Sequence, residues 1–386
     1  MTEPIEKKLR ILHLSGRPQW CGESNRVLVE CAGLAARGHD VLLGTAPHSA
    51  LVEHGRERGV PLHTGFRFTK GFRPHDTLHD IRELKKLLAS RPFDIVHLHT
   101  PRDTWPAAFA MGPRGRPGRP LLVRTKHHSL RTHGGAVHRW LYGSRIDHLI
   151  LAGERLRDTI AELTAANTLT GDRVHVIHSS IDVHRFDPDR VDGAKIRAEF
   201  GLQNRFVIGL IGRVSVEKGH AVLLNVLEKL RAEKPEIACL IVGEGDQLEA
   251  TKRRVAGGPL RDCVILTGPR RDIPDITAAL DIQVVPSLWL EASPAVVKEA
   301  MAMNVPVIAS DVGGIAEIVR DEFDGLIVRP GDEGELLAAL RRMINDASFR
   351  RSIAAAGRAK IVGRFSDEQL IERSIAVYRE ILGRPA

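Results

Sequence analysis

The feature that most constrains the fold is the alternation of short apolar runs with longer helical patterns, which is repeated along almost the whole chain. This alternation is typical of α/β proteins, in which helices join parallel strands. The runs are almost continuously apolar, as expected for strands that are covered on both faces. The predicted strands are residues 10–15, 39–45, 94–99, 120–126, 148–153, 174–179, 205–212, 236–243, 263–268, 281–287 and 306–310.

These strands form two series, separated by a polar, turn-rich segment at residues 179–193. A chain of 386 residues is also longer than a single core usually supports. We therefore expect two doubly wound, Rossmann-like domains that face each other across a cleft. Residues 1–185 form the first domain, residues 186–368 the second, and residues 369–386 a C-terminal helix that packs back toward the first domain.

Composition narrows the class of protein further. Apolar residues make up 43% of the chain, which excludes broad disorder. No apolar run approaches the roughly 20 residues needed to span a bilayer, and the first residues lack the pattern of a signal peptide. The cysteines have no CxxC spacing, so we expect reduced structural thiols in a cytoplasmic protein.

The positive charge is concentrated in one half of the chain. Residues 1–190 hold 29 Lys and Arg against 20 Asp and Glu, whereas the remainder holds 27 against 28. This half favours an anionic surface or substrate, with a soluble cationic face as the alternative. Aromatic residues are sparse and no nucleic-acid motif is present, so we expect no nucleic-acid partner.

A first candidate binding segment, GRVSVEKG, follows the predicted strand at 205–212. It places Arg213 and Lys218 near the carboxyl end of that strand, where ligands of doubly wound sheets bind. Two cations at this position can neutralise a diphosphate without a metal. The alternative is that both are solvated surface charges.

A second segment, PSLWLEASPAVVKEAMA, places one carboxylate ahead of a predicted helix and another inside it. Ser293 is the predicted N-cap and Pro294 the first helical residue, followed by Ala295. The N–H groups at such a helix start bind anions. Glu291 would lie beside the anion, and Glu299 could accept hydrogen bonds from hydroxyl groups. The alternatives are a loop acid that favours the helix dipole and a solvated helix face.

Taken together, the motifs resemble the retaining glycosyltransferases of the GT-B fold, specifically family 4 (glycosyl transferases group 1). The matching stretches are PS followed by E-x7-E, then AMA, PVIAS, DVGGIAEIV, DGLIVRPGDEGELLAAL, GRVSVEKG and LIVGEGD. The resemblance covers nearly the whole chain and is strongest over residues 205–345. It implies transfer of a sugar from a UDP- or GDP-sugar to an acceptor hydroxyl, with retention of anomeric configuration and with no metal or other cofactor.

The resemblance also implies roles for single residues. Glu291 matches the acid at the donor sugar, and His127, in a T-x-H pattern, matches a histidine that contacts this sugar from across the cleft; we take these two as the catalytic positions. Arg213 and Lys218 match the diphosphate-binding pair, and Glu299 matches the acid that binds the ribose. The donor-binding residues predicted in this way, with one arginine expected near the base, are Arg213, Lys218, Glu299, Gly22, Ser293, Pro294, Ala295 and Arg271.

Some positions depart from the family pattern. Cys21 takes the place of one glycine of the usual pair, so only Gly22 remains in the loop after the first strand. His128 is adjacent to His127, and a shift of one place is an alternative assignment. His97 and His99 are interpreted as structural histidines of a strand.

The basic half places aromatic residues beside cations, as in residues 66–91 and 134–145, a composition that suits an anionic membrane interface. In this family the N-terminal domain usually carries the acceptor site, and many acceptors are lipid-linked. The hypothesis is therefore peripheral binding to the inner face of the cytoplasmic membrane, with a glycolipid, lipopolysaccharide or other surface polysaccharide precursor as acceptor. Alternatives are a sugar-nucleotide 2-epimerase, a phosphorylase, and a non-catalytic nucleotide-sugar binder.

Overall fold

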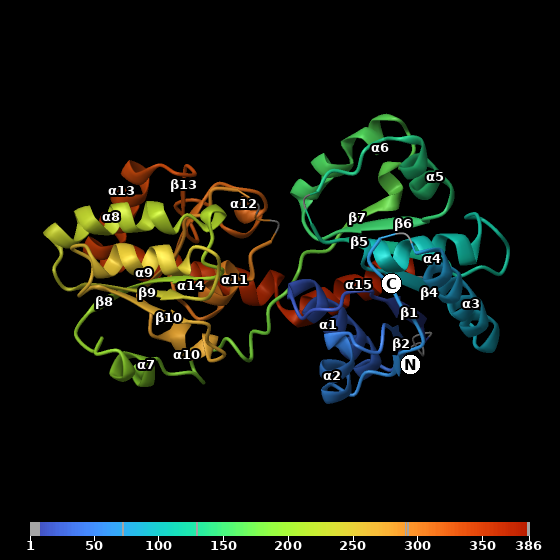
Figure 1. The fold of residues 1–386 in the computed structure, drawn as a ribbon, viewed down its shortest axis with the longest axis horizontal. Helices are drawn as coiled ribbons and strands as arrows, with labels where there is room; N and C mark the ends of the chain where they lie inside the picture. The colour runs from blue at the N-terminus through green and yellow to red at the C-terminus, as the bar shows by residue number, and fades with distance from the viewer. Residues whose placement is uncertain (1–7, 72, 129, 290, 292, 384–386) are drawn as a thin grey trace, which may run out of the picture. The chain divides into compact units, whose positions relative to one another are not determined.

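The computed structural model describes residues 8–71, 73–128, 130–289, 291 and 293–383 (Figure 1). The chain forms two compact units, one made of residues up to Ser179 together with the segment from Asp367 onward, the other of Ser180–Ser366. Each unit is an α/β sandwich around a parallel sheet, as the sequence predicts. None of the helices within these ranges is both long and apolar enough to cross a membrane.

The boundary between the units lies earlier than the predicted change of domain at residue 185. The N–H of Ile181 donates to the carbonyl of Phe365 at 2.8 Å, and Ile181 pairs with Ser366 as an isolated bridge. Ile181 and Phe186 are both buried in a core cluster of the second unit. The start of the predicted linker is therefore part of the second unit, because its apolar side chains are buried there.

The first unit is built on seven parallel strands in the order β3-β2-β1-β4-β5-β6-β7. The order reverses between β1 and β4, which makes this edge the topological switch point where ligands of such sheets bind. The strands are β1 (Arg10–Leu14), β2 (Asp40–Gly44), β3 (Leu62–His63), β4 (Ile95–Leu98), β5 (Leu121–Lys126), β6 (His148–Leu151) and β7 (Val174–Val176).

Helices join these strands, and the last helix of the chain returns to the same unit. The C-terminal helix α15 packs on α1, and its Tyr378 is fully buried. The Ser374 hydroxyl on α15 donates to the Glu30 carboxylate on α1 at 3.2 Å. The helices are α1 (Gly22–Ala36), α2 (Ala50–Glu57), α3 (Pro74–Ser90), α4 (Pro101–Met111), α5 (Ala136–Ser144), α6 (Ala161–Ala165) and α15 (Asp367–Ile381).

The second unit has six parallel strands in the order β10-β9-β8-β11-β12-β13, so its switch point lies between β8 and β11. Its strands are β8 (Phe206–Ile211), β9 (Ile237–Val242), β10 (Val264–Gly268), β11 (Ile282–Val285), β12 (Val307–Ser310) and β13 (Leu326–Val328). Its helices are α7 (Ala194–Glu199), α8 (His220–Glu233), α9 (Leu248–Ala256), α10 (Ile273–Ala278), α11 (Ala295–Ala302), α12 (Ile315–Ile318), α13 (Glu333–Asn345) and α14 (Ala347–Arg364).

Candidate functional site

Two loops at the switch point of the second unit are joined by a charged pair. Lys218 ends a 3-10 turn (Val216–Lys218) after β8, and Glu291 lies in the loop after β11. The Lys218 ammonium donates to a carboxylate oxygen of Glu291 at 2.5 Å, and the Ser287 hydroxyl donates to the same oxygen at 2.6 Å. Glu291 is 5% exposed and Ser287 is fully buried, whereas Lys218 is half-exposed and reaches in from the surface.

Backbone contacts hold the same two loops together. The N–H of Leu288 donates to the carbonyl of Glu217 at 2.8 Å. Gly219 has a φ of +71°, and a Cβ there would lie 1.9 Å from the carbonyl oxygen of Pro286. The glycine at the end of GRVSVEKG is therefore required both for the turn and for the close approach of the β11 loop.

A third loop, which follows β12, contacts the backbone carbonyl of Glu291. The N–H of Gly314 donates to the carbonyl of Glu291 at 2.8 Å. Gly313 has a φ of +54°, and a Cβ there would lie 1.6 Å from that carbonyl oxygen. The DVGG turn thus fixes the backbone from which the Glu291 carboxylate projects, and only glycine fits at its first glycine position.

The start of α11 differs from the prediction. The helix begins at Ala295, and the N-cap is Pro294, with an extended ψ of 122° and no capping hydrogen bond from a side chain. The prediction that Ser293 caps this helix is wrong, because Ser293 lies one residue before the cap position. Its hydroxyl instead accepts from the ammonium of Lys298 at 3.2 Å. Lys298 is 1% exposed, and the sequence analysis did not single it out.

Glu299 lies on α11 and is half-buried. Burial raises the pKa of its carboxyl from an ordinary value of 4.5 to about 7, although the charges of Arg185 and Lys298 act in the opposite direction. Within the described part of the chain its carboxylate makes no hydrogen bond to a side chain. A hydroxyl-bearing ligand could therefore bind to an acceptor whose charge depends on pH near neutrality.

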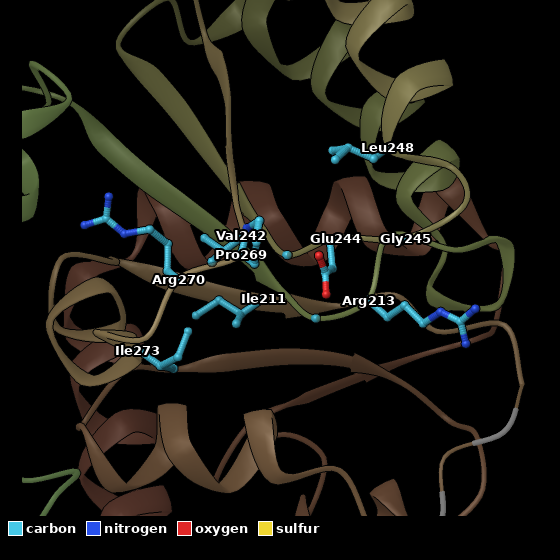
Figure 2. Close-up of a pocket in the computed structure, with 11 residues that line it drawn as sticks. Ile211, Arg213, Val242, Glu244, Gly245, Leu248, Pro269, Arg270 and Ile273 are labelled. Carbon is cyan, nitrogen blue, oxygen red and sulfur yellow. The ribbon is translucent and has the colours of Figure 1, made fainter. Parts of the chain in front are cut away.

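A pocket of about 780 Å³ opens at the carboxyl ends of β8, β9 and β10, and its lining includes Arg213 but not Lys218, Glu291 or Glu299. Figure 2 shows Arg213 and Arg270 extending in different directions from the centre of its lining. A Cβ on Gly243 would lie 1.9 Å from the carbonyl oxygen of Gly212, and one on Gly245 would lie 2.2 Å from that of Val214. The glycines of LIVGEGD are needed because two strand-end loops touch at the pocket floor.

The two neighbouring arginines near the predicted base contact, Arg270 and Arg271, have different surroundings. Arg270 lines the pocket, but its guanidinium is paired with Glu199 and with Asp272, each at 2.6 Å. Arg271 is exposed and does not line this pocket. Its carbonyl accepts from Arg185 at 3.5 Å. A contact between Arg271 and a base stays a prediction.

The two remaining predicted residues belong to the first unit. Gly22 is the first residue of α1 and is exposed, and a Cβ added there would meet no atom within 4 Å. His127 follows β5 and is half-buried, with its Nε2 3.2 Å from Nδ1 of His99. Burial, together with the nearby charge of Arg26, lowers the pKa of His127 well below its ordinary value.

The geometry of the second unit fits the binding of an anionic group at a sheet edge. Exposed Arg213 and half-exposed Lys218 emerge from one loop, and the N-terminus of α11 emerges from the next. These groups supply cations and backbone N–H donors. Glu291 adds a buried carboxylate, which stabilises positive charge that develops close by.

Two family models match the chain. The model of glycosyl transferases group 1 matches residues 192–360, and the model of glycosyltransferase family 4 matches residues 22–185. The first therefore covers the pocket and the three loops around Glu291. The second covers the sheet that carries Gly22 and His127.

Curated relatives and solved structures agree with these models. The chain is 30% identical over 253 residues to 2-deoxystreptamine glucosyltransferase of Streptomyces kanamyceticus, and this match spans 64% of each chain. It is 32% identical to the lipopolysaccharide core biosynthesis mannosyltransferase LpsB of Rhizobium meliloti, over 62% of this chain and 67% of the relative.

Among solved structures, a glycosyltransferase from Rickettsia africae superposes with a TM-score of 0.85 at 20% identity, covering 98% of this chain and all of its own. The Anabaena protein HepE, solved in complex with UDP-glucose, superposes with a TM-score of 0.78 at 22% identity, covering 96% of this chain and 100% of its own. These likenesses extend over both units. The chain belongs to glycosyltransferase family 4, the glycosyl transferases group 1, and has the GT-B fold.

Proposed function

We propose that this protein transfers a sugar from a nucleotide-diphosphate sugar to an acceptor hydroxyl, with retention of anomeric configuration and without a metal at the diphosphate. The observation that carries the proposal is the pairing of Lys218 with the buried Glu291 at the switch point, on the same β8 loop as Arg213, which lines a pocket of about 780 Å³. The donor diphosphate would bind to Arg213, Lys218 and the start of α11. The ribose would bind to Glu299.

The chemistry of a retaining transfer suits this arrangement of charges. An oxocarbenium-like centre develops positive charge at the anomeric carbon, and a carboxylate close to it lowers the barrier. The departing diphosphate gains negative charge, which preorganised donors stabilise. In the proposed reaction the bond from the anomeric carbon to the phosphate oxygen breaks, a bond to the acceptor oxygen forms on the same face, and the acceptor proton passes to the leaving phosphate. Glu291 orients the sugar and stabilises charge without a covalent adduct.

A UDP-sugar is the first donor to test, with GDP-sugars second. The fold neighbour HepE was solved with UDP-glucose, and one relative of this chain, from Escherichia coli, is named for transfer of galactose from its UDP form to a diphosphoundecaprenol-linked acceptor. Sugar preference is expected to depend on the loop at Ser293, where the family's usual glycine and aromatic are replaced.

For the acceptor we propose a glycolipid, lipopolysaccharide or other surface polysaccharide precursor, reached by peripheral binding of the first unit to an anionic membrane. The basic charge of residues 1–190 supports this, as does a cluster of Trp105, Trp140 and exposed Phe109 on α4 and α5. Sedimentation with anionic liposomes at low salt, lost at high salt, is the expected result. Failure to sediment at either ionic strength would contradict the membrane proposal alone.

The donor proposal is tested by thermal shift of the purified protein with UDP, GDP, ADP, CMP and their sugars. A ligand at 100 times its dissociation constant stabilises a folded protein by about 2.7 kcal/mol. We expect a shift with one nucleotide class, reduced in Lys218→Ala and Glu299→Ala and kept in the exposed control Lys252→Ala. A free epimer formed without acceptor would favour the 2-epimerase, and donor binding without any product would favour a non-catalytic binder. NMR of the product's anomeric proton reports retention or inversion.

A further inference from the structure

A cluster of buried histidines lies at the switch point of the first unit and is not used by the proposed donor site. His13 is on β1, His97 is on β4, and His99 follows β4; all three are at most 3% exposed. Glu30, from α1, is fully buried beside them. One side-chain nitrogen or oxygen from each of these four residues lies within 4.8 Å of those from the others.

Ring-to-ring contacts connect this cluster to His127. Nε2 of His127 lies 3.2 Å from Nδ1 of His99, and Nε2 of His99 lies 3.0 Å from Nδ1 of His13. A neutral imidazole donates from one nitrogen and accepts at the other. A chain of three neutral rings therefore has only two self-consistent sets of tautomers. In one set every proton is on Nε2, and in the other every proton is on Nδ1.

The rings are neutral near pH 7 because of where they lie. Burial lowers the pKa of His13 to about 3 and lowers the pKa values of His99 and His127 well below the ordinary range. The charge of Arg26 also lowers the pKa of His99 and of His127, and the charges of Arg17, Arg124 and His128 act on His127 in the same direction.

The carboxylate of Glu30 favours one of the two sets of tautomers over the other. Burial raises the pKa of the Glu30 carboxyl, whereas Arg26 and Ser374 favour its ionised form. Its Oε1 accepts from Arg26 at 3.3 Å and from the Ser374 hydroxyl at 3.2 Å. Its Oε2 and the Nε2 of His13 are both buried, and neither has a hydrogen-bond partner in the described part of the chain. A nearby carboxylate favours the tautomer that directs an N–H toward it. Glu30 thus favours the proton on Nε2 of His13.

We propose that His99 and His13 are positioning residues that, biased by Glu30, hold His127 with its proton on Nε2 and its Nδ1 as a hydrogen-bond acceptor. His127 Nε2–H donates to Nδ1 of His99, and His99 Nε2–H donates to Nδ1 of His13. The remaining nitrogen of His127 then accepts a hydrogen bond from a ligand hydroxyl. This last step rests on the proposed function and on the role that the family resemblance implies for His127, which is contact with the donor sugar.

The four residues could instead hold a divalent metal, but their other contacts favour the hydrogen-bonded chain. Both ring nitrogens of His97 are engaged, one with the Tyr378 hydroxyl at 2.6 Å and the other with that of Thr125 at 2.7 Å. The charge of Glu30 is already balanced by Arg26. A metal ion would bring two further positive charges into a buried site with no additional anion, which is unfavourable.

The tautomers can be read directly from the wild-type protein labelled with ¹⁵N-histidine. Two-bond ¹H–¹⁵N correlation spectra identify the nitrogen that carries the proton in each ring, and single His-to-Gln variants assign the rings. We expect His13, His99 and His127 all to carry the proton on Nε2. A proton on Nδ1 in any of the three would overturn the proposal, as would stoichiometric binding of added Zn²⁺ that shifts all three rings.

Variants test the role of Glu30 and separate this inference from the proposed function. In Glu30→Gln we expect the tautomer of His127 to become mixed or reversed, whereas the wild-type tautomer in this variant would contradict the bias from Glu30. The matched control is His175→Asn, which removes another histidine contact of the same unit, at 3.2 Å to His148, and should leave the three rings unchanged. His99→Leu should lower kcat/KM about tenfold, the effect of one hydrogen bond. If no sugar is transferred, the spectra still decide the tautomers.

Discussion

Lys218 and Glu291 lie 73 residues apart in the sequence, and their charged atoms lie 2.5 Å apart in the structure. The pair joins the loops of β8 and β11 at the point where the strand order of the second unit reverses. Lys218 therefore has two partners in the proposed reaction, the buried acid and the incoming diphosphate. Its ammonium has three N–H groups, enough to bind both at once.

Lys218→Ala is expected to destabilise the second unit as well as weaken donor binding. It leaves the carboxylate of Glu291, which is 5% exposed, with one hydroxyl donor, and an uncompensated buried charge costs about 3–5 kcal/mol. Because the Lys218 side chain is 27% exposed and water can replace part of the contact, we expect about 1–3 kcal/mol. Urea unfolding measures this loss. Lys252→Ala, which removes an exposed ion pair in the same unit, should cause no measurable change.

Gly313→Ala is expected to be among the most damaging single-methyl changes in the second unit. The added Cβ would lie 1.6 Å from the carbonyl of Glu291, and the φ of +54° is itself unfavourable for alanine. We expect a loss of about 2–4 kcal/mol, with weaker nucleotide binding because the Glu291 loop must move. Gly363→Ala, in α14 and with no atom within 4 Å of the added carbon, should instead stabilise by about 0.5 kcal/mol. Equal effects of the two changes on urea unfolding would contradict this explanation.

Glu299 should make the second unit less stable as the pH rises toward neutrality. Burial disfavours the charged form and raises the pKa of its carboxyl from an ordinary value of 4.5 to about 7 in the folded protein. Between these values the folded state holds the extra proton, so this contribution to the free energy of unfolding is present below pH 4.5 and lost as the pH rises through 7. The expected loss is about 1–3 kcal/mol.

Urea unfolding of wild type and Glu299→Gln at pH 5, 6, 7 and 8 measures this term. The variant should show a flatter pH profile and should exceed the wild type in stability at pH 8. Glu249→Gln is the matched control, because the pKa of this exposed acid beside Lys252 is lowered and it titrates below the window. Parallel profiles for wild type and Glu299→Gln would show that the pKa of Glu299 is not raised.

Tyr378→Phe is expected to destabilise the first unit without altering its packing. The change keeps the ring but removes the hydroxyl that lies 2.6 Å from Nδ1 of His97, both groups being fully buried. Leaving that nitrogen without a partner should cost about 1–3 kcal/mol. Thermal or urea unfolding of the first unit gives the value. Arg373→Ala, an exposed change on the same helix, should have no effect, and an equal loss there would point to a general weakness of α15.

Most of the fold could be predicted because its strands are buried on both faces. The apolar runs at residues 10–15, 205–212 and 236–243 became β1, β8 and β9 within one residue at each end. The long helix α14 was not predicted, because small residues and arginines interrupt the apolar periodicity of its sequence. Its start does carry a signal, since the Asp346 carboxylate accepts from the N–H of Phe349 at 2.8 Å.

The residue types of the site could be predicted where the chemistry requires them. The contacts of each side chain could not, because they depend on neighbours that are distant in the sequence. The sequence brings Glu291 and Lys218 to the same sheet edge, but nothing in it predicts that they pair directly. The N-cap was misplaced because Ser-Pro at a helix start allows two registers, and the buried Lys298 draws the Ser293 hydroxyl toward itself. His97 and His99 were interpreted as structural histidines, and only the fold reveals that His99, which follows β4, reaches His127.

The return of α15 to the first unit also sets an order of events during synthesis on the ribosome. Leu370, Ile371 and Tyr378 belong to the same core cluster as Leu9 and Ile11, so that core cannot close until the segment from Asp367 has been translated. The second unit is continuous over Ser180–Ser366 and can fold as soon as it emerges. At roughly 5–20 residues per second, the nascent first unit waits on the order of 10–40 s for its last helix. The half of the protein that is made first is thus completed last, and during that interval the apolar α1 face that receives α15 stays uncovered.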